Sequence, residues 1–410
     1  MKYIQRAIEP VIKKRAAASK CLLLLGARQV GKSTMLGQTF PKYHQVTFDD
    51  RGTRLQARED PKLFFKNHPC PLLIDEVQKE SGILEEIKIL ADRSQERGQF
   101  LLTGSQGLEL MKGASESLAG RVSISELSGL SLREITGISF NRHFLPDEEY
   151  INAREKELRQ YPDIWPIIHK GSYPELYSTE REWMDFYTSY VNTYLERDIN
   201  ELIASDGVTF FKFLTAAAAR TGEILNYANL ASDVGVSEPT IKKWVSILER
   251  TGIIYLLAPY AADALKRAIR APKLYFRDTG LACFLTRWLT ADALRVSAVA
   301  GNMFETFVVS EILKSFANEG MDYRFSVFYY RGKDRHAGTD NEIDLIIEEN
   351  GCLYPVEIKM TASPRAIMAS ANVILDKIPQ KKRGTGAILC LCEEKIWLRE
   401  NLIALPIDYL

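Results

Sequence analysis

Residues 22–34 read LLLLGARQVGKST, and this stretch decides how the N-terminal part of the chain is expected to fold. The four leucines form a short apolar run typical of a buried strand, and Gly26 ends it. Gly31, Lys32 and Ser33 complete the phosphate-loop pattern G-x-x-x-x-G-K-S/T, and a helical run follows. Glycines let the backbone turn so that successive N–H groups point at a polyphosphate. The stretch therefore predicts a strand, a phosphate loop and a helix.

The pattern predicts a role for each polar residue of the loop. Lys32 is expected to neutralise the β- and γ-phosphates, and the Ser33 hydroxyl is expected to hold Mg²⁺. ATP and Mg²⁺ are therefore the expected ligands of this part of the chain. The predicted nucleotide-binding residues of the loop are Gly26, Ala27, Arg28, Gln29, Val30, Gly31, Lys32, Ser33 and Thr34.

Two further apolar runs end in polar residues that suit the same site. Residues 71–77, PLLIDEV, place Asp75 and Glu76 at the end of a strand. Asp75 is expected to orient Mg²⁺ through its water, and Glu76 to polarise the attacking water. A third run, FLLTGS, ends in Thr103 and Ser105, which suits a polar sensor of the γ-phosphate. This order of elements resembles the core of an AAA-type ATPase.

The composition is that of a globular protein with real cores. The chain has 410 residues, of which 46% are hydrophobic and 26% charged, so two to four domains are expected. Its 53 basic and 53 acidic side chains balance, and any binding of nucleic acid must come from local patches. Six scattered cysteines without a C-x-x-C pair suit a reducing, cytoplasmic compartment. We read no membrane span and no secretion signal in the sequence.

Two arginines further along the chain are candidates for sensing the nucleotide. Arg121 ends the motif LAGR, and Arg197 lies in the motif YLERD. An arginine beside the γ-phosphate stabilises the charge of the transition state, often across a subunit boundary. A surface ion pair is an equally good role for Arg121. The aromatic-rich segment 150–205 is expected to be wholly helical, with its rings packed together rather than stacked on bases.

The N-terminal segment is strongly basic. Residues 1–20 carry six basic side chains against one acid. We expect a leading helix docked on the ATPase part, with a solvated basic side. An arm that binds nucleic acid is the alternative.

Residues 226–257 show a helix–turn–helix–strand pattern. A helix with small residues is followed by a turn at Gly235, and Ser237 suits the N-cap of a second helix over 238–250. A strand follows, and this order is typical of a winged helix. On DNA the second helix would enter the major groove, but a structural or subunit-contact role is equally open. The basic residues that would touch nucleic acid here are Lys242, Lys243, Arg250, Lys266, Arg267, Arg270 and Lys273.

The C-terminal part carries an acid–lysine pattern. Glu305 lies in the first turns of a helix, Asp344 on a strand, and Glu357 and Lys359 two residues apart on the next strand. Two carboxylates, Asp344 and Glu357, are expected to hold Mg²⁺ together with several waters. Lys359 would position the attacking water, and Glu305 would complete the site. The basic run at 330–336, YRGKDRH, would add positive charge for a phosphate backbone.

Taken together, the chain resembles the prokaryotic AAA-type ATPases that carry a C-terminal domain of unknown function with a restriction-endonuclease-like fold. The resemblance covers nearly the whole length and rests on GARQVGKST (26–34), LIDEVQ (73–78), LTGSQ (102–106), LAGR (118–121), YLERD (194–198), KLYFRDTGL (273–281), EIDLIIE (342–348) and VEIK (356–359). It implies an α/β multi-domain protein with ATPase activity. The expected domains are a P-loop AAA-type core with a parallel sheet (1–140), a helical lid-like segment (141–205), a winged-helix-like domain (206–290) and an α/β restriction-endonuclease-like domain (291–410).

These patterns predict a protein that binds and hydrolyses ATP and has a Mg²⁺-dependent nuclease domain acting on DNA. The alternative is an ATP-controlled switch that binds nucleic acid or protein and whose nuclease-like domain does not cut. A switch in a signalling complex, with a winged helix that binds protein, is a further alternative. A homo-oligomer is compatible with each of them.

Overall fold

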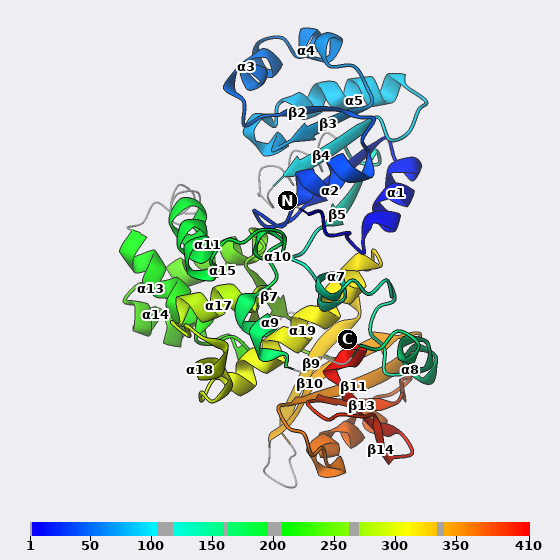
Figure 1. Cartoon of the computed structure of the whole chain (residues 1–410), viewed down its shortest axis with the longest axis vertical. Coiled ribbons are helices and arrows are strands. Elements are labelled where there is room, and N and C mark those ends of the chain that lie inside the picture. The colour runs from blue at the N-terminus through cyan, green and yellow to red at the C-terminus, as the bar shows by residue number, and fades with distance from the viewer. Residues whose placement is uncertain (1, 105–117, 160–162, 196–206, 262–269, 334–339) are drawn as a thin grey trace.

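The computed structural model describes residues 2–104, 118–159, 163–195, 207–261, 270–333 and 340–410. The chain forms an N-terminal α/β part, a helical middle part beside it, and a C-terminal part built on a second large sheet (Figure 1). Ser105, Arg197, Lys266 and Arg267 lie outside the described residues.

The N-terminal part is organised by a five-stranded sheet in which every strand is parallel to its neighbour, as the sequence predicts. The strand order is β2-β3-β4-β1-β5. The strands are β1 (Cys21–Leu25), β2 (His44–Thr47), β3 (Leu72–Asp75), β4 (Phe100–Gly104) and β5 (Val122–Glu126). Because all five run the same way, the ends of β1 and β3 meet at one edge of the sheet.

Helices cover both faces of this sheet, which explains why its three inner strands, β1, β3 and β4, are nearly uniform apolar runs. One face packs against α1 (Glu9–Ala18) and α2 (Lys32–Thr39), and the other against α3 (Arg51–Glu59), α4 (Pro61–Asn67) and α5 (Ile83–Arg93). In β1, Leu22 and Leu24 face the first pair of helices, and Leu23 faces the second group. Successive side chains of β1 thus point into two different apolar cores, one on each face of the sheet.

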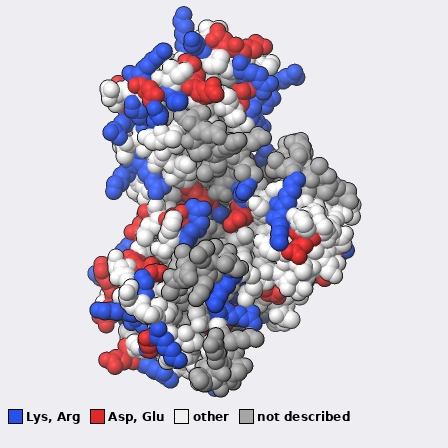
Figure 2. Space-filling model, turned by 180° about the vertical axis from the view of Figure 1, so that it is seen from behind, with Lys and Arg blue, Asp and Glu red and all other residues white. Residues whose placement is uncertain are grey.

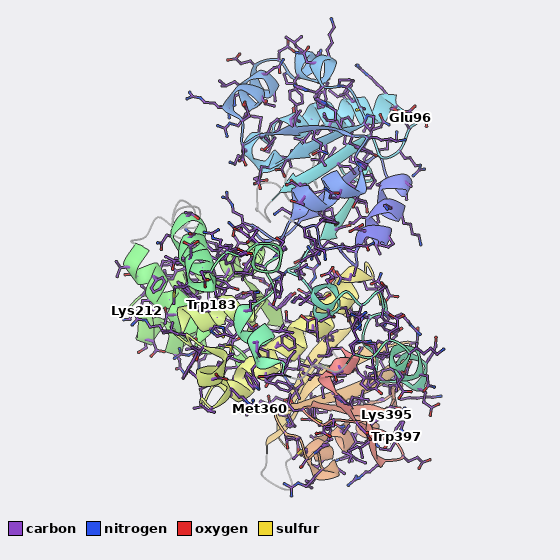
Figure 3. All side chains as sticks on the ribbon, viewed as in Figure 1. Glu96, Trp183, Lys212, Met360, Lys395 and Trp397 are labelled. Atoms are coloured by element: carbon purple, nitrogen blue, oxygen red, sulfur yellow. The ribbon has the colours of Figure 1, made fainter. Side chains whose placement is uncertain are left out.

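The middle part is less regular than the wholly helical segment that we expected. Its described helices are short: α7 (Leu132–Thr136), α8 (Glu148–Glu155), α9 (Trp165–Lys170), α10 (Glu175–Ser178), α11 (Trp183–Tyr190) and the π-helix η2 (Val191–Leu195). Pro174 and the glycine at position 171 interrupt any longer helix. The aromatic residues do pack together, as expected. Tyr173, Phe186 and Tyr190 form one buried cluster, and Trp183, seen among the helices in Figure 3, stacks on His169.

A helical unit with a small sheet follows. Gly235 ends one helix in the left-handed conformation, and the Ser237 hydroxyl caps the next helix, as the sequence predicts. The small sheet has the order β6-β8-β7 with antiparallel pairing. The elements are α13 (Gly207–Ala218), β6 (Glu223–Ile224), α14 (Tyr227–Val234), α15 (Glu238–Arg250), β7 (Ile254–Leu257) and β8 (Lys273–Phe276), followed by α17 (Thr279–Leu285) and α18 (Ala291–Arg295).

The C-terminal part is a mixed seven-stranded sheet packed against α19 (Ala300–Asn318), a long helix with a mostly buried surface. The strand order is β14-β15-β13-β11-β10-β9, with β12 paired to β11. The strands are β9 (Val327–Lys333), β10 (Asp340–Glu349), β11 (Cys352–Lys359), β12 (Lys382–Arg383), β13 (Gly386–Cys390), β14 (Ile396–Arg399) and β15 (Leu402–Pro406); short helices η3 (Tyr323–Phe325), η4 (Ala366–Lys377) and η5 (Ile407–Tyr409) complete this part. Figure 3 labels Met360, which follows β11, and Trp397 on the edge strand β14.

One apolar core runs through all three parts. It joins Leu24 of the first sheet, Trp244 of α15, Phe304 of α19 and Leu389 of the last sheet. The parts are therefore packed on one another through side chains rather than strung on open linkers. In the described residues, no helix has the length and apolar character that crossing a membrane requires.

Candidate functional site

The phosphate loop lies between β1 and α2 and has the backbone that its glycines permit. Gly31 and Gln29 have positive φ values of 89° and 61°. A Cβ atom on Gly26 would lie 2.3 Å from the Leu127 carbonyl oxygen, so only glycine fits there. Non-glycine residues with positive φ concentrate at functional sites, where the surrounding structure holds them. The loop thus forms the tight cradle that a polyphosphate requires.

Lys32 is buried at the base of this loop. Its Nζ atom donates hydrogen bonds to the carbonyl oxygens of Gly26 and Ala27, at 3.0 and 2.9 Å. Burial lowers the pKa of Lys32, and the charges of Glu76 and Asp75 oppose that shift. A lysine in this position puts a single cation beside the N–H groups of the loop.

The structure brings the predicted polar residues of three segments together at the carboxyl edge of the sheet. The Ser33 hydroxyl donates to Asp75 Oδ1 at 2.5 Å, and the Thr103 hydroxyl donates to the same oxygen. The Glu76 backbone N–H donates to Thr103 Oγ1 at 3.2 Å, and Glu76 has the left-handed backbone φ 56°, ψ 44°. A serine hydroxyl beside an aspartate is the donor set that Mg²⁺ accepts when phosphate oxygens and waters supply the rest. The residues therefore fit ATP and Mg²⁺.

Arg121 does not belong to this group, which corrects the prediction. It directly precedes β5, whose first residue pairs with Cys21 at the start of β1. Since the two strands are parallel, Arg121 lies at the edge of the sheet opposite the phosphate loop. Its guanidinium makes two bonds to the Asp92 carboxylate on α5, and these bonds raise the pKa of Arg121. Arg121 thus has the alternative role, a surface ion pair.

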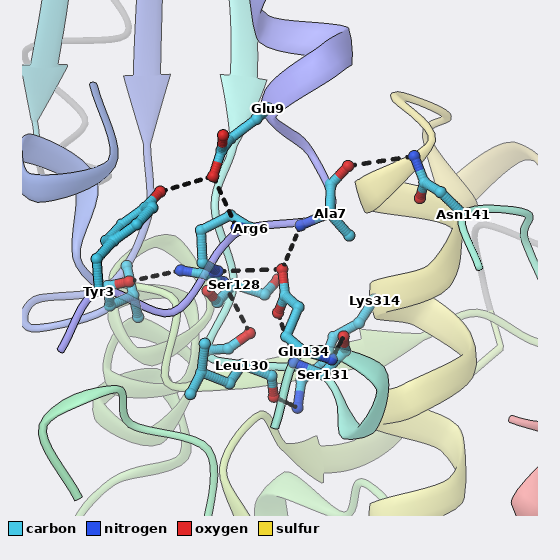
Figure 4. A network of polar contacts seen from close by, with 12 residues as sticks. Tyr3, Arg6, Ala7, Glu9, Ser128, Leu130, Ser131, Glu134, Asn141 and Lys314 are labelled. Carbon is cyan, nitrogen blue, oxygen red and sulfur yellow. Dashed lines mark hydrogen bonds and ion pairs between the residues drawn. The ribbon is translucent and has the colours of Figure 1, made fainter. Parts of the chain in front are cut away.

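Sequence reasoning missed Arg6, a buried residue that contacts the phosphate loop. Its Nη1 donates to the Val30 carbonyl at 2.9 Å, its Nη2 to the Ser128 carbonyl at 2.7 Å, and its Nε to Glu134 Oε1 at 3.1 Å (Figure 4). We expected the basic side of residues 1–20 to be solvated, but Arg6 is only 3% exposed. The segment is basic throughout, so composition could not single this arginine out.

The Arg6 network extends to α19. Glu134 also accepts from the backbone N–H groups of Ala7 and Ser131, both at 2.7 Å. Beyond Glu134, Glu311 of α19 accepts from the Leu132 N–H at 2.7 Å. Lys314 of the same helix donates to the Leu130 carbonyl at 2.9 Å (Figure 4). The short segment around α7 therefore joins the phosphate loop to the helix that carries Glu305.

The acid–lysine pattern of the C-terminal part assembles into a second cluster. Lys359 Nζ lies 2.8 Å from Asp344 Oδ2 and 2.9 Å from Glu357 Oε2. The Ile358 N–H also donates to Asp344 Oδ2 at 2.8 Å. Asp344 and Glu357 come from the adjacent antiparallel strands β10 and β11, as predicted. Burial favours the neutral form of Lys359, but the charges of Asp344 and Glu357 outweigh it and raise the Lys359 pKa.

Glu357 is the most unusual carboxylate of the cluster. It is 3% exposed, and its Oε1 is buried without a hydrogen-bond partner. Burial and the charge of Asp344 raise the pKa of Glu357 to about 8. An orphaned carboxylate oxygen costs free energy unless a cation or a proton satisfies it. Among the described residues no group of three or more histidine, cysteine or acidic side chains is placed to hold a metal, so a cation here would bind two carboxylates and waters.

Glu305 lies beside this cluster but is held by other residues. Its Oε1 accepts from Tyr275 at 2.6 Å and lies 3.1 Å from Lys273 Nζ. Burial and the nearby Asp344 charge raise the pKa of Glu305, while Lys273 opposes the shift. Lys273 also pairs with Glu342 at 2.7 Å.

The position of Lys273 corrects a second expectation. We placed it in a surface basic run, but it is 3% exposed and inserted among acids. A signal was present: in the strand KLYF, Lys273 and Tyr275 share one face and the apolar residues share the other.

Other candidate basic residues have surface positions. Lys242 pairs with Glu238 at 2.7 Å, and Lys243 and Arg270 are exposed. Arg250 lines a cavity of about 690 Å³ between β5, the end of α15 and the end of α19. Basic and acidic residues are mixed over the face seen in Figure 2. The described residues of that face do not form a uniformly basic surface.

Comparison with known proteins matches three successive stretches of the chain to protein families. Residues 18–136 match the family described as an AAA domain, residues 161–292 match a domain of unknown function (DUF8612), and residues 300–410 match a domain of unknown function (DUF4143). The chain is 29% identical over 402 residues to the uncharacterized protein Rv2008c of Mycobacterium tuberculosis, covering 94% of this chain and 80% of that protein. It is 24% identical over 299 residues to the uncharacterized protein MJ1637 of Methanocaldococcus jannaschii, covering 62% and 60%.

Solved structures with partial likeness include two ATPases. The Walker-type ATPase PABY2304 of Pyrococcus abyssi has 15% identity and a TM-score of 0.40, over 68% of this chain and 94% of that one. A signal transduction ATPase with numerous domains from Pyrococcus horikoshii, PH0952, has 13% identity and a TM-score of 0.26, over 77% and 47%. The family match, the parallel sheet and the phosphate loop together identify the N-terminal part as a P-loop AAA-type domain.

Proposed function

We propose that this chain, whose N-terminal part is a P-loop AAA-type domain, binds ATP with Mg²⁺ and hydrolyses it. The observation that carries the proposal is the meeting of Ser33, Asp75 and Thr103 at the carboxyl edge of the sheet, beside a loop with Lys32 at its base. The match of residues 18–136 to the AAA domain supports the same conclusion.

In this proposal, each residue of the nucleotide site has a role that follows from its position. The N–H groups of residues 26–34 and the Lys32 ammonium would bind the phosphates. Ser33 and Asp75 would hold Mg²⁺, and the ion would supply positive charge beside the phosphate oxygens. Glu76 accepts a proton from the attacking water, and Thr103 fixes the Asp75 carboxylate. Glu76 directly follows β3, and its left-handed backbone turns the chain out of the strand direction at this point.

Turnover of a Glu76→Gln variant tests this assignment. The variant should bind ATP like the native protein and hydrolyse it about 10²–10⁴-fold more slowly, the range of one general base. Lys242→Ala, which removes an exposed ion pair on α15, should leave turnover unchanged. An unchanged rate in Glu76→Gln would remove Glu76 as the base.

We propose a second activity at the C-terminal cluster: divalent-cation-dependent cleavage of DNA. The observation that favours it is the orphaned Oε1 of Glu357 beside Asp344, which is where a cation would be stabilised. Asp344 and Glu357 would hold Mg²⁺, which would supply an activated water. Lys359 would hold the scissile phosphate or that water, and Glu305 would add negative charge nearby.

A restriction-endonuclease-like fold for residues 291–410 and a winged helix for residues 206–290 belong to this proposal. The order α13, β6, α14, α15, β7, β8 supports the winged helix. We also propose domain boundaries at residues 140 and 205. The apolar core extends across both boundaries.

Cleavage assays separate this activity from its alternative, an ATP-controlled switch that binds DNA or protein without cutting. Duplex, single-stranded and branched DNA would be incubated with Mg²⁺, with and without ATP. Cleavage should occur with the native protein and be lost in Lys359→Ala and Glu357→Gln. ATP hydrolysis with no cleavage of any substrate would favour the switch.

A further inference from the structure

Two segments from the middle part of the chain pack directly on the phosphate loop. The turn between α15 and β7 brings Gly252 against the loop, so that a Cβ atom there would lie 3.3 Å from the Ala27 backbone nitrogen. The second segment begins α10: Pro174 Cγ would lie 3.8 Å from a Cβ atom on Gly31. Both segments lie outside residues 18–136, the span of the AAA domain match.

Arg277 fastens the first of these segments. Its backbone N–H donates to the Ile253 carbonyl at 2.9 Å, and its Nε donates to the Ile254 carbonyl at 3.2 Å. Its guanidinium lies over the Tyr255 ring, 4.1 Å from the centroid. Its Nη1 pairs with Glu126 at the end of β5, which is the same edge of the sheet as the phosphate loop. Arg277 therefore ties the Gly252 turn to the ATPase sheet.

The next residue, Asp278, fastens the second segment. One carboxylate oxygen accepts from the Ser172 N–H at 2.6 Å and from the Ser172 hydroxyl at 2.8 Å. The other accepts from the Tyr187 hydroxyl at 2.6 Å and from the Leu281 N–H at 2.7 Å. Asp278 is 5% exposed, and these four donors satisfy its charge. Ser172 lies two residues before Pro174, so Asp278 sets where Pro174 meets the loop.

We propose that Arg277 and Asp278 are positioning residues of the nucleotide site, contributed by the middle part of the chain. They hold the Gly252 turn and the Ser172–Pro174 segment against the outer side of the phosphate loop. The loop then keeps the curvature that aims its N–H groups at the phosphates. The inference rests on the proposed ATP binding, since it assigns residues that shape the same site.

A matched pair of glycine substitutions tests the contact of the turn with the loop. Gly252 and Gly235 have similar left-handed backbones, with φ of 76° and 85°, but a Cβ on Gly235 meets no atom within 4 Å. Gly252→Ala and Gly235→Ala should therefore both lower the thermal midpoint through backbone strain. Only Gly252→Ala should raise the Kd for ATP, by about tenfold. Equal ATP affinity in the two variants would overturn the inference.

Substitutions of capping aspartates test Asp278 itself. Asp278 caps α17, and Asp147 caps α8 by the same kind of bond, to the Tyr150 N–H. Asp278→Asn should raise the Kd and the KM for ATP about tenfold, while Asp147→Asn should leave both unchanged. Ser172→Ala, which removes only one hydroxyl, should give a smaller rise in a folded protein.

These measurements distinguish the inference from the proposed function. If the native protein binds no ATP, the proposed function fails. If it binds ATP and all the variants bind it equally well at a temperature where they are folded, Asp278 has only a structural role and the inference fails. Asp278→Glu keeps the negative charge on a longer side chain. A Kd for ATP closer to the native value in this variant than in Asp278→Asn would support the view that the charge of Asp278 positions the Ser172–Pro174 segment.

Discussion

At the scale of the residue, the two clusters show what spacing along the chain can predict. Ser33, Asp75, Asp344, Glu357 and Lys359 follow or lie on recognisable strands, and strands of known direction bring their ends together. Spacing along the chain does not predict which charged residues are buried. Arg6 and Lys273 look like any surface cation in the sequence, because only the packing of distant segments decides that they are buried.

The position of Arg121 leads to a prediction for the nucleotide site. Because Arg121 pairs with Asp92 at the opposite edge of the sheet, Arg121→Ala should leave the Kd for ATP unchanged. Equilibrium titration with ATP measures this. An affinity loss in the monomeric protein would mean that Arg121 reaches the nucleotide after all.

The raised pKa of Glu357 predicts how stability depends on pH. In the folded chain its pKa is about 8, above the ordinary value of 4.5, so folding favours the protonated form. This contribution is fully present below pH 4.5 and is lost as the pH rises through about 8. Urea unfolding across this range, without divalent cations, should show a steeper fall in the free energy of unfolding for the native protein than for Glu357→Gln. The exposed-acid control Glu393→Gln should retain the native slope.

At the scale of the element, strand β8 joins the two clusters. Lys273 at the start of β8 pairs with Glu305 and Glu342. Arg277, directly after the end of β8, holds the Gly252 turn that packs on the phosphate loop. The sequence predicts β1, the loop and α2 well, because apolar run, glycine turn and helix agree locally. It predicts the segment 150–205 poorly, since tertiary packing of short helices replaces long-range periodicity there.

Removing the charge at the start of β8 should destabilise the fold. Lys273→Met leaves Glu305 largely buried without its cation, which should lower the free energy of unfolding by about 3 kcal/mol. Lys395→Met, which removes a partly exposed pair with Glu155, should cost about 0–1 kcal/mol. Urea denaturation measures both. Similar small losses would show that Lys273 is solvated in solution.

At the scale of the whole molecule, the apolar core predicts that the parts unfold together. The sequence suggests four domains, and Leu24, Trp244 and Leu389, which lie in three of them, belong to one core. Local patterns carry no information on how domains pack, which is why this continuity could not be predicted.

Tryptophan fluorescence reports on this coupling directly. The five tryptophans lie at positions 165, 183, 244, 288 and 397, all beyond the AAA domain match. ATP at 100 times its Kd stabilises the folded state by about 2.7 kcal/mol. The midpoint of thermal unfolding followed by tryptophan fluorescence should therefore rise with ATP. An unmoved tryptophan transition, with ATP bound, would show that the N-terminal part unfolds independently.

The measurement that tests the central claim most directly is equilibrium titration of the native protein and of Lys32→Ala with ATP and Mg²⁺. Lys32 is the buried cation at the base of the phosphate loop, so its loss removes the charge that holds the phosphates. We predict saturable binding at one site per chain in the native protein, and loss of that binding in a variant with a native circular dichroism spectrum. Equal binding by both proteins, or none by the native protein, would contradict the account.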